Sequence, residues 1–214
     1  MKMGKFESDK NNRSQPAPVE EDLAEVKHAA EKNLLLYLHD MIYLVAAIVI
    51  LFLLIFRVVI VSGDSMYNTL WDGDYVLLLS NVLYGEPEYG DVVVVSKASY
   101  DQGTPIVKRV IATEGQTVDI DFQLGLVFVD GIALDEPYTY TPTNVSEGVS
   151  FPLTVEEGCV FVMGDNRNIS KDSRSPEIGL VDTREILGKA LFLFFPGTDD
   201  GASQRDYDRI GAIS

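Results

Sequence analysis

Cysteine and histidine are scarce in this sequence. Its 214 residues include one cysteine, Cys159, and two histidines, His28 and His39. A single cysteine cannot form an internal disulfide, so cysteine usage does not indicate a redox compartment. Zinc sites need clusters of histidine and cysteine, and the sequence has none, so we expect no metal site. Because Cys159 stands in an apolar run, EEGCVFVMG, with no histidine near it, we interpret it as a small core residue and not as a nucleophile.

Positive charge is also in short supply. Lysine and arginine number 17 against 33 acidic residues, which gives a net charge of −16 and a pI of about 4.4. Nucleic-acid binding needs a basic surface, so we expect no nucleic-acid partner. Docking on anionic lipid through charge is disfavoured for the same reason, and any association with a membrane must be hydrophobic.

A long apolar segment, in contrast, is present. Residues 41–56 (MIYLVAAIVILFLLIF) carry no charge and are followed by Arg57 and a further apolar run, VVIV. A membrane-spanning helix needs about 20 apolar residues, and an arginine near its end can extend its side chain to the interface. We therefore predict a transmembrane helix over residues 40–60. The alternatives are a buried core helix and a cleaved signal peptide. The polar lead is too long for the latter, and no A-x-A-like cleavage site follows.

The charges on the two sides of this segment predict its orientation. Several basic residues precede it, whereas after Arg57 the next basic residue is Lys97. The positive-inside rule then places residues 1–39 in the cytoplasm as a polar tail. Apolar residues spaced three to four apart predict a helix over about residues 19–39. Residues 61–214 would form the extracytoplasmic domain of a single-pass protein of the cell membrane.

The residues after position 70 are typical of an all-β domain. Short β-branched or apolar runs alternate there with Gly, Pro, Asp and Asn, as in antiparallel sheets. The predicted strands are Tyr75–Leu79, Asp91–Val95, Ile106–Ala112, Thr117–Ile120, Leu126–Val129, Cys159–Met163 and Ala190–Phe195. Residues 134–151 are polar and contain proline, and we interpret them as an excursion from the core.

Ser65 is a candidate nucleophile where the apolar segment meets this domain, in RVVIVSGDSMYNTL. A serine hydroxyl needs a neighbouring base to remove its proton. Histidine is the usual base, but His28 and His39 both precede the predicted span and would lie on the other side of the membrane. With that topology a Ser-His-Asp triad is excluded, and the remaining bases are a lysine or a carboxylate.

Lys108 is the lysine in the most unusual setting. It lies within TPIVKRVIA, where strand alternation places it on one face with Ile106 and Val110. Burial among aliphatic side chains would lower its pKa from about 10.4 to about 7–8, which gives a neutral amine able to take a proton. On these residues alone, the alternative stays open that Lys108 points into solvent from an edge strand, as ordinary surface charge like its neighbour Arg109.

A third stretch, GDNRNISKDSRSPEIG at residues 164–179, is polar and follows an apolar run. Its Gly-Asp-Asn start is typical of a tight turn, and its arginines and carboxylates can form rigid forks. The stretch is either a solvated loop or a network that orients a catalytic lysine, and composition alone favours the loop.

Taken together, these pieces resemble the bacterial type I signal peptidases, which are membrane-bound serine proteases. The matching stretches are GDSMYNTL (63–70), DGDYVLL (72–78), GDVVVV (90–95), KRVIA (108–112) and GDNRNISKDSR (164–174). Their order, after one membrane span, is specific to the family, whereas each stretch alone is not. The resemblance implies a mainly β protein of the short Gram-positive-like form. In that form an N-terminal transmembrane helix leads into an antiparallel β-sheet catalytic domain of the LexA-like Ser-Lys type.

The resemblance also implies roles for individual residues. Ser65 would be the nucleophile and Lys108 the general base of a Ser-Lys dyad. Ser170, the first serine of the GDNRxxSxDSR signature, would hydrogen-bond that lysine. Asp172 and Arg174 would support the site as a pair. No metal or cofactor is implied.

Around the nucleophile the sequence departs from part of the family. Asn68 stands where proline is usual, and Gly63 stands where some relatives have a serine that contributes to the oxyanion hole. The oxyanion would then be held by backbone N–H groups in the neighbourhood of Gly63, chiefly that of Ser65. Val61 and Val107, each close in sequence to a dyad residue, are the candidate walls of a shallow substrate pocket.

The implied activity is the removal of N-terminal signal peptides from secreted preproteins after small-x-small sites. The partners would be secretory preproteins and, through residues 40–60, the lipid bilayer, and we expect a monomer. A LexA-type repressor with the same dyad is disfavoured, because residues 1–40 are too short and not basic. The other alternative is an inactive membrane-anchored β-domain that binds a secretory partner. The joint presence of Ser65, Lys108 and Ser170 argues against it.

Overall fold

A computed structural model describes residues 18–198 and 204–213 of the chain. The chain divides into two compact units, residues 1–51 and residues 52–214. The part of the predicted cytoplasmic tail before residue 18 lies outside the described residues.

The first unit consists, in its described part, of the helix α1 (Pro18–Ile55), whose last turn belongs to the second unit. The helix expected over residues 19–39 is present, and it continues without a break into the apolar segment. The stretch Glu25–Ile55 has a window of mean hydropathy 2.5 and is long and apolar enough to cross a membrane. This helix fits a membrane anchor.

The helix ends earlier than the sequence predicts. Phe56–Ile60 form the strand β1, which pairs antiparallel with β2 (Tyr75–Ser80). The predicted transmembrane segment 40–60 is therefore helical only as far as Ile55. The physical reason is twofold: the β-branched residues of this run favour a strand, and the edge of β2 offers a hydrogen-bonding partner.

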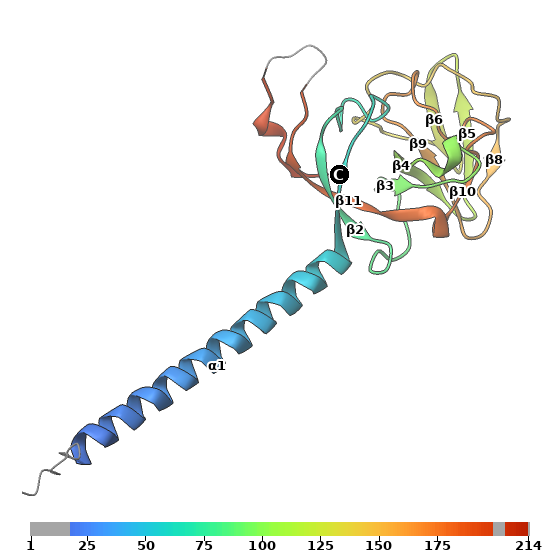
Figure 1. The fold of residues 1–214 in the computed structure, drawn as a ribbon. Helices are drawn as coiled ribbons and strands as arrows, with labels where there is room; N and C mark the ends of the chain where they lie inside the picture. The colour runs from blue at the N-terminus through green and yellow to red at the C-terminus, as the bar shows by residue number, and fades with distance from the viewer. Residues whose placement is uncertain (1–17, 199–203, 214) are drawn as a thin grey trace, which may run out of the picture. The chain divides into compact units, whose positions relative to one another are not determined.

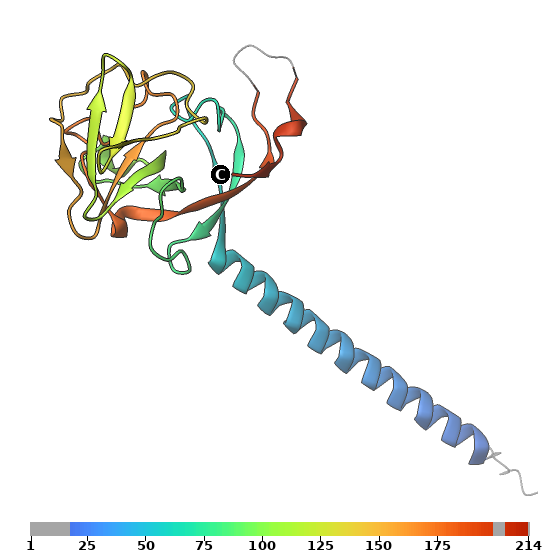
Figure 2. The same cartoon turned by 180° about the vertical axis from the view of Figure 1, so that it is seen from behind.

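The second unit is built from two antiparallel sheets (Figures 1 and 2). The larger sheet has the order β1-β2-β11-β3-β4-β9-β10, and β12 pairs with β11. Its further strands are β3 (Val92–Val95), β4 (Ile106–Thr113), β9 (Cys159–Met163), β10 (Val181–Asp182), β11 (Ile186–Phe195) and β12 (Gly211–Ala212). The smaller sheet has the order β7-β6-β5-β8. Its strands are β5 (Thr117–Asp121), β6 (Leu126–Val129), β7 (Ile132–Ala133) and β8 (Leu153–Thr154). Short 3₁₀ turns are η1 (Asp101–Gly103), η2 (Thr183–Glu185) and η3 (Tyr207–Arg209).

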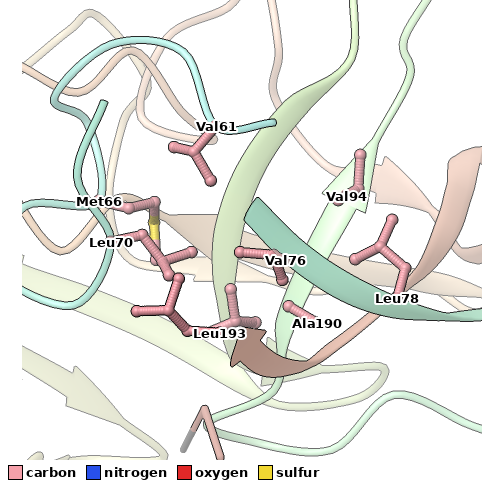
Figure 3. Packing of buried hydrophobic residues seen from close by; sticks show 9 residues of the cluster. Val61, Met66, Leu70, Val76, Leu78, Val94, Ala190 and Leu193 are labelled. Atoms are coloured by element: carbon pink, nitrogen blue, oxygen red, sulfur yellow. The ribbon is translucent and has the colours of Figure 1, made fainter. Parts of the chain in front are cut away.

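One core cluster joins the larger sheet to the loop that carries Ser65. Met66 and Leu70 of that loop are buried, and Figure 3 shows them gathered with residues of the strands. The buried members of the cluster are Val61, Met66, Leu70, Val76, Leu78, Val92, Val94, Ala190 and Leu193. Because burying two large side chains stabilises a loop, the apolar residues beside Ser65 hold it against the sheet.

A second cluster packs the smaller sheet against the larger one. Its buried members are Ile111, Ala112, Val118, Ile120, Val127, Val129, Val155, Phe161 and Met163. They come mainly from β4, β5, β6 and β9. The second half of β4 thus has apolar packing. The charged pair Lys108 and Arg109 lies in its first half.

The mainly β, antiparallel fold class predicted from the sequence is confirmed. Each predicted strand run overlaps one of the longer strands described above. Residues 134–151 contain no helix or strand. Their ends nevertheless pack back on the core, because Leu134 and Phe151 contact the second cluster.

Candidate active site

Ser65 lies in a loop, residues 61–74, that is closed at its base by backbone hydrogen bonds. The N–H of Val61 donates to the carbonyl of Asp74 (2.9 Å), and the N–H of Gly73 donates to the carbonyl of Val61 (2.9 Å). The apolar residues of the loop point into the core, as described above. The chain therefore leaves β1, presents Ser65 and returns to β2 within one compact turn.

Lys108 faces Ser65 from β4. Its Nζ lies 2.8 Å from Ser65 Oγ and donates to the carbonyl of Val107 at 2.9 Å. Only 2% of the residue is exposed, because β4 is a central strand between β3 and β9. The alternative of an edge-strand lysine in solvent is therefore wrong. The structure brings the predicted nucleophile and base into direct contact.

Burial lowers the pKa of Lys108 to about 8, from an ordinary value of 10.5. Desolvation of the ammonium is the main cause, and the nearby carboxylates of Asp172, Asp165 and Glu147 oppose it by favouring the charged form. An amine with this pKa is partly neutral at physiological pH. It can therefore accept the proton of a serine hydroxyl, which an ordinary lysine cannot do efficiently.

Arg109, the neighbour of Lys108, is also buried. Its Nε and Nη2 donate to the two carboxylate oxygens of Asp165 at 2.9 and 2.8 Å, and Nη1 donates to the carbonyl of Gly90 at 2.8 Å. Its guanidinium lies 4.0 Å from the ring centroid of Tyr138. Arg109 is thus no surface charge. It ties β4 to the turn that begins the 164–174 signature.

That turn holds the nucleophile from the other side. The N–H of Asn166 donates to the carbonyl of Ser65 at 3.0 Å, and its side-chain amide donates to the carbonyl of Asp64 at 3.2 Å. Gly164 makes the close approach possible: a Cβ added there would lie 2.4 Å from the Ser65 carbonyl oxygen and 2.2 Å from Ser170 Oγ. Only glycine fits this position without displacing the nucleophile loop.

Asp172 and Arg174 form the expected pair. Arg174 Nε and Nη2 donate to Asp172 Oδ1 and Oδ2, both at 2.8 Å, and both residues are fully buried. Asp172 also accepts from the N–H of Gly164 at 3.0 Å. On its outer side Arg174 pairs with Glu147 of the 134–151 loop at 3.2 Å. The signature is therefore a buried network and not a solvated loop.

Ser170 departs from the expectation. The residue is 2% exposed, and within the described part of the chain its hydroxyl has no hydrogen-bond partner. The expected hydrogen bond to Lys108 is therefore not formed. The Nζ of Lys108 is engaged instead by Ser65 and the Val107 carbonyl, and the Ser170 hydroxyl packs against Gly164.

Two backbone N–H groups near the nucleophile, those of Gly63 and Ser65, are the candidates for holding an oxyanion. The N–H of Gly63 donates to Asp72 Oδ1 at 2.8 Å and is not available. The N–H of Ser65 donates to no acceptor among the described residues. Gly63 contributes the turn itself, because its φ of 83° belongs to the region that favours glycine. Of the two N–H groups, only that of Ser65 is therefore available to donate to an oxyanion.

A cavity of about 330 Å³ lies beside the two candidate catalytic residues. It is lined by Val59, Ile60, Val61, Ser62, Ser65, Val94, Pro105, Ile106, Val107 and Lys108. Both residues proposed from the sequence as pocket walls, Val61 and Val107, are among them. Val59 and Ile60 were missed because the sequence assigned them to the membrane helix.

Comparisons with known proteins place the chain in a family. The family described as "Signal peptidase, peptidase S26" matches residues 34–195, which include both candidate catalytic residues. The chain belongs to this family. It is therefore a peptidase of the S26 class, whose activity is the removal of signal peptides from preproteins.

Individual signal peptidases are similar to this chain over most of its length. "Signal peptidase I" of Bacillus licheniformis is 33% identical over 183 residues, which cover 81% of this chain and 96% of that protein. "Signal peptidase I T" of Bacillus subtilis is 34% identical over 193 residues, 83% of this chain and 95% of its own. "Probable signal peptidase I-1" of Synechocystis is 39% identical over 146 residues, 64% of this chain and 70% of its own.

The tight turn at Gly164, Asp165 and Asn166 was expected from the sequence, but its contacts with Ser65 and Arg109 were not. The charged pair Lys108-Arg109 within a strand was the strongest sequence signal for these contacts. Two buried cations need carboxylates near them, and the turn supplies Asp165. Among the described residues, no group of three or more His, Cys, Asp or Glu side chains is arranged to hold a metal ion.

Proposed function

We propose that this signal peptidase is a membrane-bound serine endopeptidase with Ser65 as nucleophile and neutral Lys108 as general base. It removes N-terminal signal peptides from secreted preproteins after small-x-small sites. The observation that carries the proposal is the 2.8 Å contact between Lys108 Nζ and Ser65 Oγ at a buried amine. Few structural reasons exist to bury an unpaired lysine beside a serine, whereas a Ser-Lys dyad requires it.

The reaction follows from this contact. The neutral amine of Lys108 accepts the Ser65 hydroxyl proton, and Oγ attacks the scissile carbonyl carbon. The oxyanion that forms accepts a hydrogen bond from the Ser65 N–H. The resulting ammonium gives its proton to the leaving amine as the peptide bond breaks, which leaves an acyl-enzyme. A water molecule then loses a proton to Lys108 and attacks the ester carbonyl. As the ester bond breaks, Lys108 returns that proton to Ser65 Oγ, and the signal peptide leaves with its new carboxyl end.

The surrounding carboxylates suit both protonation states of the base. In the resting enzyme burial favours the neutral amine, which starts the reaction. In the tetrahedral intermediate Lys108 is an ammonium, and the negative charges of Asp172, Asp165 and Glu147 favour that form. The site therefore has a base whose lowered pKa makes the neutral amine available for attack, and whose charged form is stabilised by the carboxylates afterwards.

The cavity supports a preference for small side chains before the cut. Its walls next to the dyad are branched aliphatic residues, Val61, Val94 and Val107, which leave room for small apolar groups. Val61 is 4% exposed and packed in the core, so it cannot move aside easily for a larger side chain. Binding discrimination against one extra methylene in such a pocket is about 1–3 kcal/mol.

The placement in the membrane is part of the same proposal. Residues 1–39 lie in the cytoplasm, residues 40–55 reach the bilayer as the last part of the helix, and residues 56–214, which begin with β1, form the extracytoplasmic catalytic domain. The excursion at 134–151 belongs to that domain. The protein acts as a monomer on secretory preproteins and has no nucleic-acid partner, in line with its net charge of −16.

A cleavage assay with a purified preprotein tests the proposal. Ser65→Ala and Lys108→Ala should each abolish cleavage, and Cys159→Ser should retain it, because Cys159 lies outside the site. Mass spectrometry of the products should show a cut after a small residue with a small residue two places before it. Full activity of Lys108→Ala would end the dyad hypothesis. A wild-type protein that binds the preprotein without cutting it would favour the inactive β-domain instead.

A further inference from the structure

The part of the chain that follows the residues matched by the family contacts the loop 61–74, which carries Ser65. The match ends at residue 195, and the described residues 204–213 follow it with the turn η3 and the strand β12. β12 pairs with β11, and Ile213 packs against the core cluster that holds Met66 and Leu70. One side chain of this segment, Arg209, points back to the loop that carries Ser65.

Arg209 binds the base of that loop through Asp74. Its Nη1 and Nη2 donate to Asp74 Oδ1 and Oδ2 at 3.0 and 2.7 Å, and Asp74 is fully buried. The same carboxylate accepts from the N–H groups of Trp71 at 2.7 Å and Gly197 at 2.6 Å. A buried carboxylate needs a partner of opposite charge, and among the described residues Arg209 supplies it.

Arg209 also reaches the middle of the loop. Its Nη2 donates to the carbonyl of Thr69 at 3.3 Å, and its guanidinium lies 3.7 Å from the ring centroid of Trp71. A planar guanidinium can stack and make forked hydrogen bonds at the same time, which a lysine ammonium cannot. One side chain thus connects the loop's base at Asp74 with its centre at Thr69.

Thr69 is held from the opposite side as well. Its hydroxyl donates to Asp165, and Arg109 Nη2 lies 3.3 Å from that hydroxyl. Asp165 belongs to the turn whose next residue, Asn166, binds the Ser65 carbonyl. The loop is therefore fixed at Thr69 between the signature turn on one side and the C-terminal segment on the other.

We propose that Arg209 is a positioning residue for Ser65. Arg209 acts through Asp74 and Thr69 and touches neither the substrate nor the reacting atoms. This inference rests on the proposed function of Ser65 as the nucleophile. A purely structural role would be to keep the C-terminal segment attached. The β12–β11 pairing and the packing of Ile213 already do that. What Arg209 adds is a fixed position for the loop, and a shift of about 1 Å at a nucleophile can lower the rate of attack by about 100-fold.

The variant Arg209→Lys tests this in the full-length enzyme. It keeps a positive charge opposite Asp74, so folding is retained, but it cannot hold Asp74 and Thr69 together. Arg205→Lys is the matched control in the same segment. Arg205 donates to the Pro196 carbonyl and stacks on Phe195 at 4.5 Å, outside the loop 61–74. Thermal melts give the folded fraction of each variant, and kcat and KM are then measured at a temperature where all are folded.

Arg209→Lys should lower kcat by about 10- to 100-fold with KM and the pH midpoint of cleavage unchanged, while Arg205→Lys matches the wild type. A kcat within twofold of the wild type, or a loss that only follows the unfolded fraction, overturns the inference. Wild type and Ser65→Ala are run in parallel. If the wild type does not cleave, or Ser65→Ala does, the proposed function itself fails and the inference falls with it.

Discussion

Cleavage by this enzyme should depend steeply on pH, with a midpoint near 8. Burial lowers the pKa of Lys108 to about 8, and only the neutral amine can act as base. The neutral fraction is then about 1% at pH 6, about 9% at pH 7 and about 90% at pH 9. kcat/KM, which reports the free enzyme, should rise about tenfold per pH unit below the midpoint and level off above pH 9.

A charge change near the base should move this midpoint in a known direction. Glu147 is one of the carboxylates that raise the pKa of Lys108, and its partner Arg174 lowers it. Glu147→Gln removes the first effect and leaves the second in place. The midpoint should therefore fall below that of the wild type. Glu157→Gln, an exposed acidic residue that is not among the groups acting on Lys108, is the matched control and should leave the midpoint unchanged.

The assay is the initial rate of preprotein cleavage in detergent micelles between pH 5.5 and 10, at constant ionic strength and subsaturating substrate. Circular dichroism at each pH confirms that the enzyme is folded. A rate that stays flat between pH 6 and 8.5 would refute the assignment of Lys108 as the base. An upward shift of the midpoint in Glu147→Gln would refute the electrostatic reasoning while leaving the dyad intact.

Two further predictions concern stability and packing. Because the pKa of Lys108 is about 8 in the folded chain and 10.5 when unperturbed, the unfolded chain binds more protons between these values. Stability should therefore rise across that window, and at pH 7 Lys108→Met should be more stable than the wild type by about 3 kcal/mol in urea unfolding. The gain should shrink toward pH 10.5, and a variant less stable than the wild type at pH 7 would contradict this. Gly164→Ala should lower kcat by about 10-fold or more, because its Cβ would collide with the Ser65 carbonyl, whereas Gly85→Ala has open space and should not. Equal kcat values for these two variants, measured in the same cleavage assay, would show that the nucleophile loop can move without loss.

The sequence predicted the strands, the fold class and the two residues in contact at the site. These could be predicted because each depends on a pattern within a short stretch of sequence. Alternating β-branched runs and a lysine within one of them are visible within a few positions. The shell around the dyad was harder, because its partners are far apart in the chain: Arg109 meets Asp165, and Arg174 meets Glu147. Glu147 lies in a polar loop whose composition gives no sign of that contact.

The Ser170 hydroxyl shows the limit of a motif. Ser170 Oγ packs against Gly164, beside the Ser65 carbonyl. The hydrogen bond that the signature implied between Ser170 and Lys108 is not formed, because the Nζ of Lys108 is engaged by Ser65 and the Val107 carbonyl.

The strand β1 also changes where this protein can be divided. A soluble fragment beginning at residue 61, the domain boundary expected from the sequence, would lack the strand that covers the edge of β2. It would expose unpaired backbone groups there, which promotes aggregation, and would lose Val59 and Ile60 from the cavity wall. A fragment beginning at Phe56 keeps both. The residues directly after the membrane helix are thus part of the catalytic domain and not a linker.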